Sequence, residues 1–469
     1  MGALPREVPK VAILVDFGST YTKVVAVDLD TPAILGIAQH PSTVDTDVTI
    51  GLERALAGLR SMAGPHARLR LASSSARGGL RLVAIGLVPE LTAEAARQAA
   101  LGAGAKVVKV FAHELTRADI AEIESLRPDL VLLAGGTDGG NRDAVTLNAR
   151  MLAGSDLAAP VIMAGNRVAR DEVKRLLELG GKRCYVTANV LPELDQLDVE
   201  PVRGVIREVF VRHIVEAKGL DRAKGIVGDI IMPTPTAVMG AAQLLSLGTP
   251  DEPGLGDLMV VDVGGATTDV HSIADSPPGN GLVARGLPEP LAKRTVEGDL
   301  GVRVNAQSVV ELAHTHDLRV DLAAALRVPE ARTRSDYLAA NTDVLASTAD
   351  ELRLEVVMAS ACVDIAVERH VGHVKETYGI HGPVQLLYGK DLRRVKALIG
   401  VGGVFAYGKD AGEILHAGLA RSDRPHSLRP ESPALYHDAS YVFYAMGLLA
   451  AREPTIALRL LKKALVQHG

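Results

Sequence analysis

The clearest pattern near the start of the chain is an apolar run that breaks at a small polar turn and then resumes. Residues 11–28, VAILVDFGSTYTKVVAVD, carry β-branched and aliphatic residues on both sides of Gly18, which predicts two strands joined by a tight turn. A third strand is predicted at 33–40, followed by a helix at 50–61. The pattern then predicts a pair of strands, 67–73 with 79–88. A β-hairpin therefore opens a mixed α/β fold.

From residue 92 the pattern changes to helices and strands in strict alternation. Helices are predicted at 92–101, 115–126, 142–152 and 168–179, and strands at 106–111, 129–134 and 160–164. Short connections between alternating elements imply right-handed crossovers and a parallel sheet. This part of the chain is expected to form its own doubly wound α/β segment.

A break rich in Pro, Gly and Asp, GTPDEPGLGD at 248–257, precedes a second copy of the opening pattern. The pattern of residues 259–273, MVVDVGGATTDVHSI, again predicts a strand, then Asp, Gly and hydroxyl residues, and then a second strand. Duplication of a domain is the economical explanation of this repeat. A long helix is predicted at 350–378 and two helices in the tail, 441–468. The predicted domains are 1–91 (first lobe), 92–250 (α/β segment, inserted or continuing that lobe) and 257–469 (second lobe).

Composition and charge narrow the class of protein. Hydrophobic residues make up 47% of the 469 residues, but aromatics only 3%, so the core must be aliphatic, as in layered α/β proteins. The net charge of −5 is not concentrated in blocks, which argues against nucleic acid and anionic membranes as partners. Cys184 and Cys362 are expected to be plain buried thiols. With no signal-peptide core and no membrane-length apolar run, the expectation is a cytoplasmic protein.

The repeated turns have the chemistry of a phosphate site. A glycine-containing hairpin presents backbone N–H groups in a concave nest that suits phosphate oxygens. The hydroxyls of Ser19, Thr20, Thr267 and Thr268 can add donors. Asp16 and Asp262 end the first strand of each copy and suit Mg²⁺, which prefers oxygen ligands and bridges nucleotide phosphates. Two such hairpins facing each other would hold a polyphosphate between two lobes.

Two further features bear on this hypothesis. Lys23 could add a positive charge on the first hairpin, or its side chain could point away. LIGVGGVFAYG at 398–408 places a strand before Gly402 and Gly403, where an adenine and its ribose could lie on the backbone.

These motifs carry a family resemblance. DFGSTYTK, DVGGATTDV and GVGGVF resemble the phosphate-1, phosphate-2 and adenosine motifs of the ATPase superfamily that includes actin, heat-shock chaperones and sugar kinases. The motifs LLAGGTDGGN, MPTPTAV and RTVEGDLGVRVNA extend the resemblance to nearly the whole chain. The chain resembles the MutL-type accessory proteins encoded beside adenosylcobalamin-dependent glutamate mutase. This family is distinct from the mismatch-repair protein of similar name. The resemblance implies duplicated actin-like (ribonuclease H-like) ATPase domains.

The resemblance also implies roles for single residues. Asp16 and Asp262 would govern Mg²⁺ and its waters. ATP phosphates would be bound by Gly18, Ser19, Thr20, Gly264, Gly265, Thr267 and Thr268, and adenosine by Gly402 and Gly403. Glu297 could orient the attacking water or reach the metal; the alternative is a carboxylate at a helix N-terminus. Asp299 is a weaker candidate of the same kind.

The function implied by the resemblance is an ATP-binding and slowly hydrolysing chaperone that assists or reactivates a cobalamin-dependent mutase, with a homodimer left open. Two alternatives use the same hairpins: a small-molecule kinase and an actin-like scaffold. The loop AGGTDGG at 134–140 follows an apolar strand, where α/β sheets bind ligands. It is interpreted either as a contact to nucleotide or partner, or as a flexible glycine turn.

Overall fold

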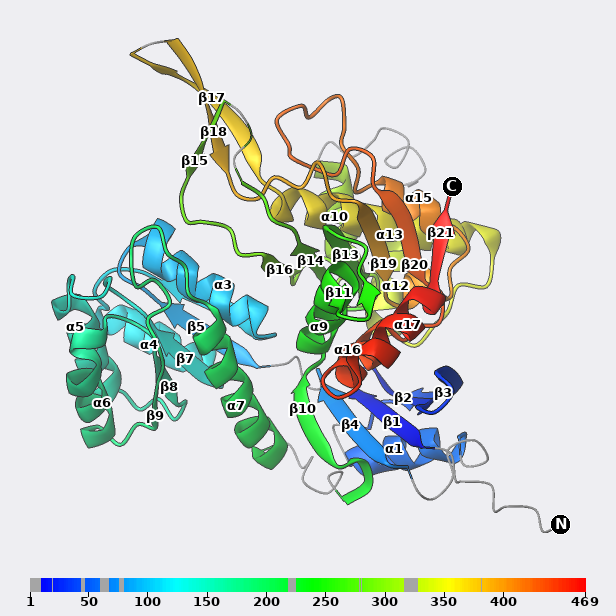
Figure 1. The fold of residues 1–469 in the computed structure, drawn as a ribbon, viewed down its shortest axis with the longest axis horizontal. Coiled ribbons are helices and arrows are strands. Elements are labelled where there is room, and N and C mark those ends of the chain that lie inside the picture. Colours follow the sequence, from blue (N-terminus) through cyan, green and yellow to red (C-terminus); the bar gives the residue numbers. More distant parts are fainter. Residues whose placement is uncertain are drawn as a thin grey trace. The chain divides into compact units, whose positions relative to one another are not determined.

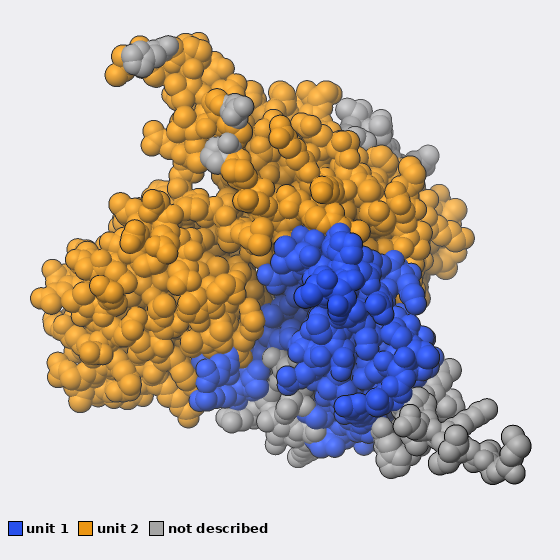
Figure 2. Space-filling view, viewed as in Figure 1, with its two compact units in different colours: residues 1–79, 208–254, 442–464 blue, residues 80–207, 255–441, 465–469 orange. Residues whose placement is uncertain are grey.

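The structure is a computed structural model that describes residues 10–18, 20–43, 47–59, 67–75, 80–217, 225–277, 279, 281–315, 328–380 and 382–469 (Figure 1). Its contacts divide the chain into two compact units, coloured separately in Figure 2. Unit 1 comprises residues 1–79, 208–254 and 442–464, and unit 2 comprises 80–207, 255–441 and 465–469.

Unit 1 is built on one mixed sheet with the strand order β10-β4-β1-β2-β3. The first three strands form antiparallel pairs, whereas β4 lies parallel to β1 and β10 parallel to β4. All seven residues of β1 are buried, as a central strand requires. The strands are β1 (Val11–Phe17), β2 (Tyr21–Asp28), β3 (Ala33–Pro41), β4 (Leu69–Ser74) and β10 (Asp229–Pro233).

The helices of unit 1 come from three separate parts of the chain. They are α1 (Val48–Ala57), α9 (Thr234–Leu247), α16 (Phe443–Ala450) and α17 (Pro454–Ala464), and a short ladder of β11 (Gly248–Thr249) and β12 (Glu252–Pro253) follows α9. The sequence of α16, FYAMGLLA, is apolar on every side, which predicts a buried helix. It packs against α9, α17 and β1.

Unit 2 contains a sheet that repeats the order of the first one. The order is β16-β14-β13-β19-β20-β21, and its first five strands again form an antiparallel meander of three strands followed by two strands parallel to the first strand of that meander, while β21 is added antiparallel to β20. The strands are β13 (Leu258–Val263), β14 (Thr268–Ile273), β16 (Ala292–Glu297), β19 (Ala397–Val401), β20 (Ala434–Asp438) and β21 (Leu465–His468). The common topology confirms the predicted duplication of an actin-like (ribonuclease H-like) sheet.

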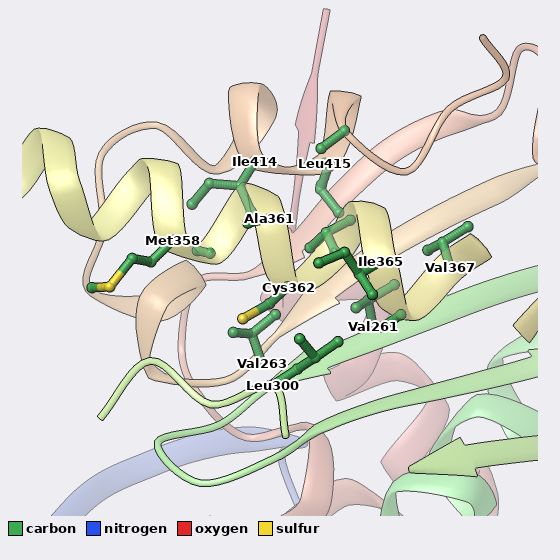
Figure 3. Packing of buried hydrophobic residues seen from close by; sticks show 14 of the residues in the cluster. Val261, Val263, Leu300, Met358, Ala361, Cys362, Ile365, Val367, Ile414 and Leu415 are labelled. Atoms are coloured by element: carbon green, nitrogen blue, oxygen red, sulfur yellow. The ribbon is translucent and has the colours of Figure 1, made fainter. Parts of the chain in front are cut away.

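A long helix, α13, packs on this second sheet. Figure 3 shows Cys362 and Ile365 of the helix beside Val261 and Val263 of β13 and beside Leu300, so an aliphatic core lies directly beneath the second repeated turn. Thr348 and Glu351 form a capping box that fixes the start of the helix. The helices of this region are α10 (Ala306–Thr315), α12 (Val328–Ala340), α13 (Ala349–His370), α14 (Gly403–Ala406) and α15 (Ala411–His416).

Unit 2 also contains an all-parallel sheet of five strands in the order β6-β5-β7-β8-β9. Counted within this segment the order is 2-1-3-4-5, that of doubly wound α/β folds, as predicted. Its strands are β5 (Arg81–Ile85), β6 (Lys106–Phe111), β7 (Leu130–Leu133), β8 (Val161–Met163) and β9 (Cys184–Val186). Its helical elements are η2 (Pro89–Ala93), α3 (Glu94–Gly102), α4 (Arg117–Leu126), α5 (Asp143–Ala153), η3 (Arg167–Ala169), α6 (Arg170–Leu179) and the start of α7 (Glu200–Ala217).

Two predictions about elements were wrong. The strands at 67–73 and 79–88 do not pair, because β4 joins the sheet of unit 1 and β5 is the second strand in the parallel sheet of unit 2. The helix predicted to run to residue 378 ends at His370, because the chain then packs against strand β18 (Gly382–Tyr388). Gly372 lies so close to this strand that a Cβ there would be 2.5 Å from the carbonyl oxygen of Tyr388. The two helices predicted in the tail are α16 and α17, and the short strand β21 follows them.

The residues after α13 form a small separate sheet. It consists of β15 (Leu282–Arg285), β17 (His373–Gly379) and β18 (Gly382–Tyr388). One division between the contact units, after Gly254, lies within the Pro-, Gly- and Asp-rich stretch at 248–257, and α9 and α16 pack together in unit 1. Within the described residues, no helix is both long enough and apolar enough to cross a membrane. Cys362 is buried as expected, whereas Cys184 is only half-buried.

Candidate functional site

The turn between β1 and β2 is closed by one backbone hydrogen bond. The Gly18 nitrogen donates to the Tyr21 carbonyl oxygen at 3.1 Å. A Cβ at Gly18 would lie 2.6 Å from that oxygen, so only glycine fits this position. Thr20 is exposed on the turn, and Ser19 lies outside the described residues. Thr20 therefore presents an exposed residue at this turn, and phosphate binding here stays a prediction.

Asp16 lies buried behind this turn, with 1% of its surface exposed. Its Oδ1 accepts hydrogen bonds from Ser73 Oγ at 3.0 Å and from Thr234 Oγ1. Lys23 Nζ lies 3.5 Å from the Asp16 Oδ2 and 5.4 Å from the centre of the Tyr444 ring. Of the two orientations considered for Lys23, the structure has the one that turns its charge toward Asp16.

Unit 2 contains a turn that is closed by the same backbone hydrogen bond, from a glycine nitrogen to the carbonyl oxygen three residues later. The Gly264 nitrogen donates to the Thr267 carbonyl oxygen at 2.9 Å, and a Cβ at Gly264 would lie 2.9 Å from that oxygen. In both copies the aspartate, Asp16 or Asp262, stands two residues before the glycine, on the strand that leads into the turn. The internal repeat seen in the sequence is therefore a repeat of conformation.

The second turn is held from behind by a segment that follows β16. The Val302 nitrogen donates to the Gly264 carbonyl oxygen at 3.2 Å, and the Val304 nitrogen donates to the Gly265 carbonyl oxygen at 2.8 Å. The Asn305 amide donates to the Ala266 carbonyl oxygen. These bonds engage the backbone carbonyl oxygens of Gly264, Gly265 and Ala266. Asn305 was not among the predicted site residues, although it lies in the motif RTVEGDLGVRVNA.

The two threonines of the second turn make different contacts. Thr268 is buried, and its hydroxyl donates to the Leu300 carbonyl oxygen at 2.9 Å. The Thr267 hydroxyl lies 3.3 Å from Asp269 Oδ2, and Asp269 in turn pairs with the buried Arg294. Thr267 is therefore the more accessible of the two hydroxyls, and phosphate binding by either stays a prediction.

The predicted adenosine motif lies beside Asp262. Asp262 of β13 stands opposite Val401 of β19 in the sheet, and Gly402 follows directly. Gly402 has φ +106°, and a Cβ there would lie 2.4 Å from the Val263 carbonyl oxygen and 3.0 Å from Asp262 Oδ1. Gly403 begins the short helix α14. Within unit 2, the fold therefore brings the phosphate-2 and adenosine motifs together.

Glu297 ends β16, and its neighbour across the ladder is Thr268 of the second turn. Its Oε2 accepts a hydrogen bond from Arg369 Nη1 at 2.7 Å, and the same guanidinium binds Asp299 at 2.8 and 3.0 Å. Burial raises the pKa of the Glu297 carboxyl, and the charge and hydrogen bond of Arg369 oppose that rise. Glu297 is a strand-end residue in an ion-pair cluster, so the alternative of a helix N-terminal carboxylate is wrong.

The oxygen atoms around Asp16 are of the kind that Mg²⁺ prefers as ligands. No group of three or more His, Cys, Asp or Glu side chains that could hold a metal occurs among the residues the structure describes. Asp16, with the Ser73 and Thr234 hydroxyls around it, offers hard oxygen donors instead. Such a set fits a magnesium ion that keeps several waters and takes its other ligands from nucleotide phosphates.

The loop at 134–140 is fastened by side chains. Asn166 donates to the Gly140 carbonyl oxygen at 3.0 Å and accepts from the Gly139 nitrogen at 3.2 Å. Asn189 donates to the Gly136 carbonyl oxygen and to Asp138, both at 3.0 Å. These bonds do not fit the interpretation of a flexible glycine turn, because they tie the loop to the ends of the neighbouring strands.

Comparison with known proteins identifies the family. A family model described as MutL protein matches residues 12–465. The chain belongs to the MutL protein family. Protein MutL of Clostridium tetanomorphum is 46% identical over 460 residues, which cover 97% of this chain and 99% of that protein. The predicted membership of the MutL-type family is thereby confirmed.

Solved structures with a similar backbone fold have low sequence identity to this protein. A nucleotide-free acetone carboxylase is 17% identical with a TM-score of 0.41, over 94% of this chain and 70% of the other. A gluconate kinase from Lactobacillus acidophilus is 10% identical with a TM-score of 0.37, over 98% and 93% of the two chains. The strand order of the two sheets, not these superpositions, establishes the fold.

Proposed function

We propose that this protein is an ATP-binding and slowly hydrolysing chaperone that reactivates an adenosylcobalamin-dependent mutase. The observation that carries the proposal is the duplicated turn: in each of the two sheets an aspartate stands two residues before a sterically obligatory glycine that closes the turn. Membership of the MutL family supports a mutase as the partner.

In this proposal the chain's residues bind one ATP at both turns. The backbone N–H groups after Gly18 and Gly264 bind phosphate oxygens, and Gly402 lets the nucleoside approach the backbone. Asp16 and Asp262 would hold Mg²⁺, which would neutralise phosphate charge. Glu297 orients the water that attacks the γ-phosphate.

ATP can drive a conformational change only if it binds one conformation better than another. Phosphate contacts to both turns exist together only when the two lobes close on the nucleotide. Hydrolysis and phosphate release remove part of those contacts, and the lobes reopen. We propose that this cycle loosens the mutase so that damaged cobalamin leaves and intact cofactor enters.

The proposal predicts that the protein restores activity to a damaged mutase. A mutase that has lost the adenosyl group of its cofactor is incubated with the full chain, ATP, Mg²⁺ and fresh adenosylcobalamin, and mutase turnover is followed. Activity should return with ATP but not with a non-hydrolysable analogue. A mutase that stays inactive with ATP would contradict the partner assignment, and stoichiometric formation of a phosphorylated small molecule would favour the kinase alternative.

A further inference from the structure

One arginine at the end of α13 links two carboxylates on the segment that holds the second turn. Arg369 Nη1 lies 2.7 Å from Glu297 Oε2 and 2.8 Å from Asp299 Oδ1, while Nη2 lies 3.0 Å from Asp299 Oδ2. The Glu297 side chain is 13% exposed and the Arg369 side chain 33% exposed. The guanidinium therefore holds a largely buried Glu297 carboxylate while it remains partly open to solvent itself.

The arginine binds only one of the two carboxylate oxygens of Glu297. Within the described residues, Oε1 accepts no hydrogen bond, whereas Oε2 accepts the bond from Arg369. A carboxylate held at one oxygen by a planar, permanently charged donor keeps a defined orientation. Its second oxygen is then available to a water molecule.

Glu297 begins the segment 297–305, whose last residues contact the second turn. Residues 302–305 hold the carbonyl groups of the turn, and Asn305 also donates to the Gly298 carbonyl oxygen at 2.9 Å. Arg303 pairs with Glu355, which lies on α13 as Arg369 does. One rigid helix therefore fixes both ends of the segment, and with it the position of Glu297 relative to the turn.

The other charges around Glu297 do not replace this contact. Arg97 on α3 is near enough to lower the pKa of Glu297, but its guanidinium binds Glu94 through two hydrogen bonds of 2.7 Å. Asp299 carries a like charge that repels Glu297 and raises its pKa. Without Arg369, Glu297 would lose its direct partner and face the repulsion of Asp299.

We propose that Arg369 is a positioning residue for ATP hydrolysis, which holds Glu297 with one oxygen directed to the attacking water. The inference rests on the proposed function, since it assigns a role within the same site. Arg369 acts through Glu297 and not through the nucleotide, so its loss should slow the chemical step without weakening ATP binding. A displacement of a catalytic group by about 1 Å can cost as much as about 100-fold in rate.

The test compares Arg369→Met, Arg369→Lys and Arg353→Met in the full chain with Mg-ATP. Arg353 is the matched control because it lies on α13 and pairs with Glu413 in an exposed ion pair. Arg369→Met should lower kcat roughly 10- to 100-fold with unchanged nucleotide affinity, Arg369→Lys should recover part of that loss, and Arg353→Met should match the wild type. Wild-type kcat in Arg369→Met, or equal losses in the two Arg369 variants, would overturn the proposal.

A double-mutant cycle with Glu297→Gln separates positioning from a merely structural role. If Arg369 acts through Glu297, Arg369→Met should not slow turnover further once Glu297 is already Gln. Independent losses that multiply, or a fall in the melting temperature that accounts for the lost activity, would contradict the role. Failure of the proposed function looks different: the wild-type chain itself would then hydrolyse no ATP, with or without the mutase.

Discussion

Replacing Asp16 or Asp262 with Asn is expected to lower kcat for Mg-ATP hydrolysis by about 100-fold or more, because each change removes a charge that governs the metal at the reacting phosphates. The effect should appear in both variants, because the two aspartates hold the same position in the duplicated turn. The amide has the size of the carboxylate, and in Asp16→Asn its oxygen can still accept from Ser73 Oγ. The fold should therefore survive.

The measurement is steady-state phosphate release at saturating ATP and Mg²⁺, together with the melting temperature of each variant. Asp28→Asn is a suitable control, because Asp28 lies at the far end of β2 and its side chain caps a surface turn at Thr31. Turnover at the wild-type level in either Asp16→Asn or Asp262→Asn would contradict the metal role of that residue.

Glu297→Gln should abolish most hydrolysis while leaving ATP binding intact. A positioned acid or base contributes roughly 10²- to 10⁴-fold to a rate, and the amide cannot accept the proton of the attacking water. Burial raises the pKa of Glu297, so the wild-type rate should fall with decreasing pH at a higher pH than an ordinary glutamate would give. Below that pKa the carboxyl is protonated and cannot act as a base.

This prediction is checked by the pH dependence of kcat and by nucleotide titration of the variant. Glu413→Gln is the control, since Glu413 is an exposed partner of Arg353. The acid limb of the profile should be absent from the residual activity of Glu297→Gln. The same acid limb in that variant would mean that another group titrates, and loss of ATP affinity would mean that Glu297 binds the nucleotide or its metal.

The turns could be predicted from the sequence because their chemistry is local. Gly18 and Gly264 each close a turn with a residue three positions later, and the aspartate of each turn is two residues away. The residues around Asp16 could not be found this way, since Ser73 and Thr234 reach it only because β4 and β10 lie beside β1 in the sheet. Thr234 does lie in MPTPTAV, so that motif held a signal.

The predictions of strand pairing and of one helix end were wrong where pairing between strands distant in the sequence overrides the local residue pattern. The strand at 81–85 is apolar after Arg81, and nothing in its own residues tells which sheet it joins. The residues after His370 continue a helical pattern, but they are drawn into the small sheet where β17 pairs with β18. The contacts of Arg369 could not be predicted from the sequence either, because its partners Asp299 and Glu297 are 70 and 72 positions away.

The central claim is that both turns bind the same triphosphate. A crystal structure of the full chain with Mg²⁺ and a non-hydrolysable ATP analogue tests it most directly. Phosphate oxygens are expected within hydrogen-bonding distance, about 2.7–3.2 Å, of backbone nitrogens in both turns, one after Asp16 and one after Asp262. A nucleotide that touches only one turn, or that binds elsewhere and leaves both turns to solvent, would contradict it.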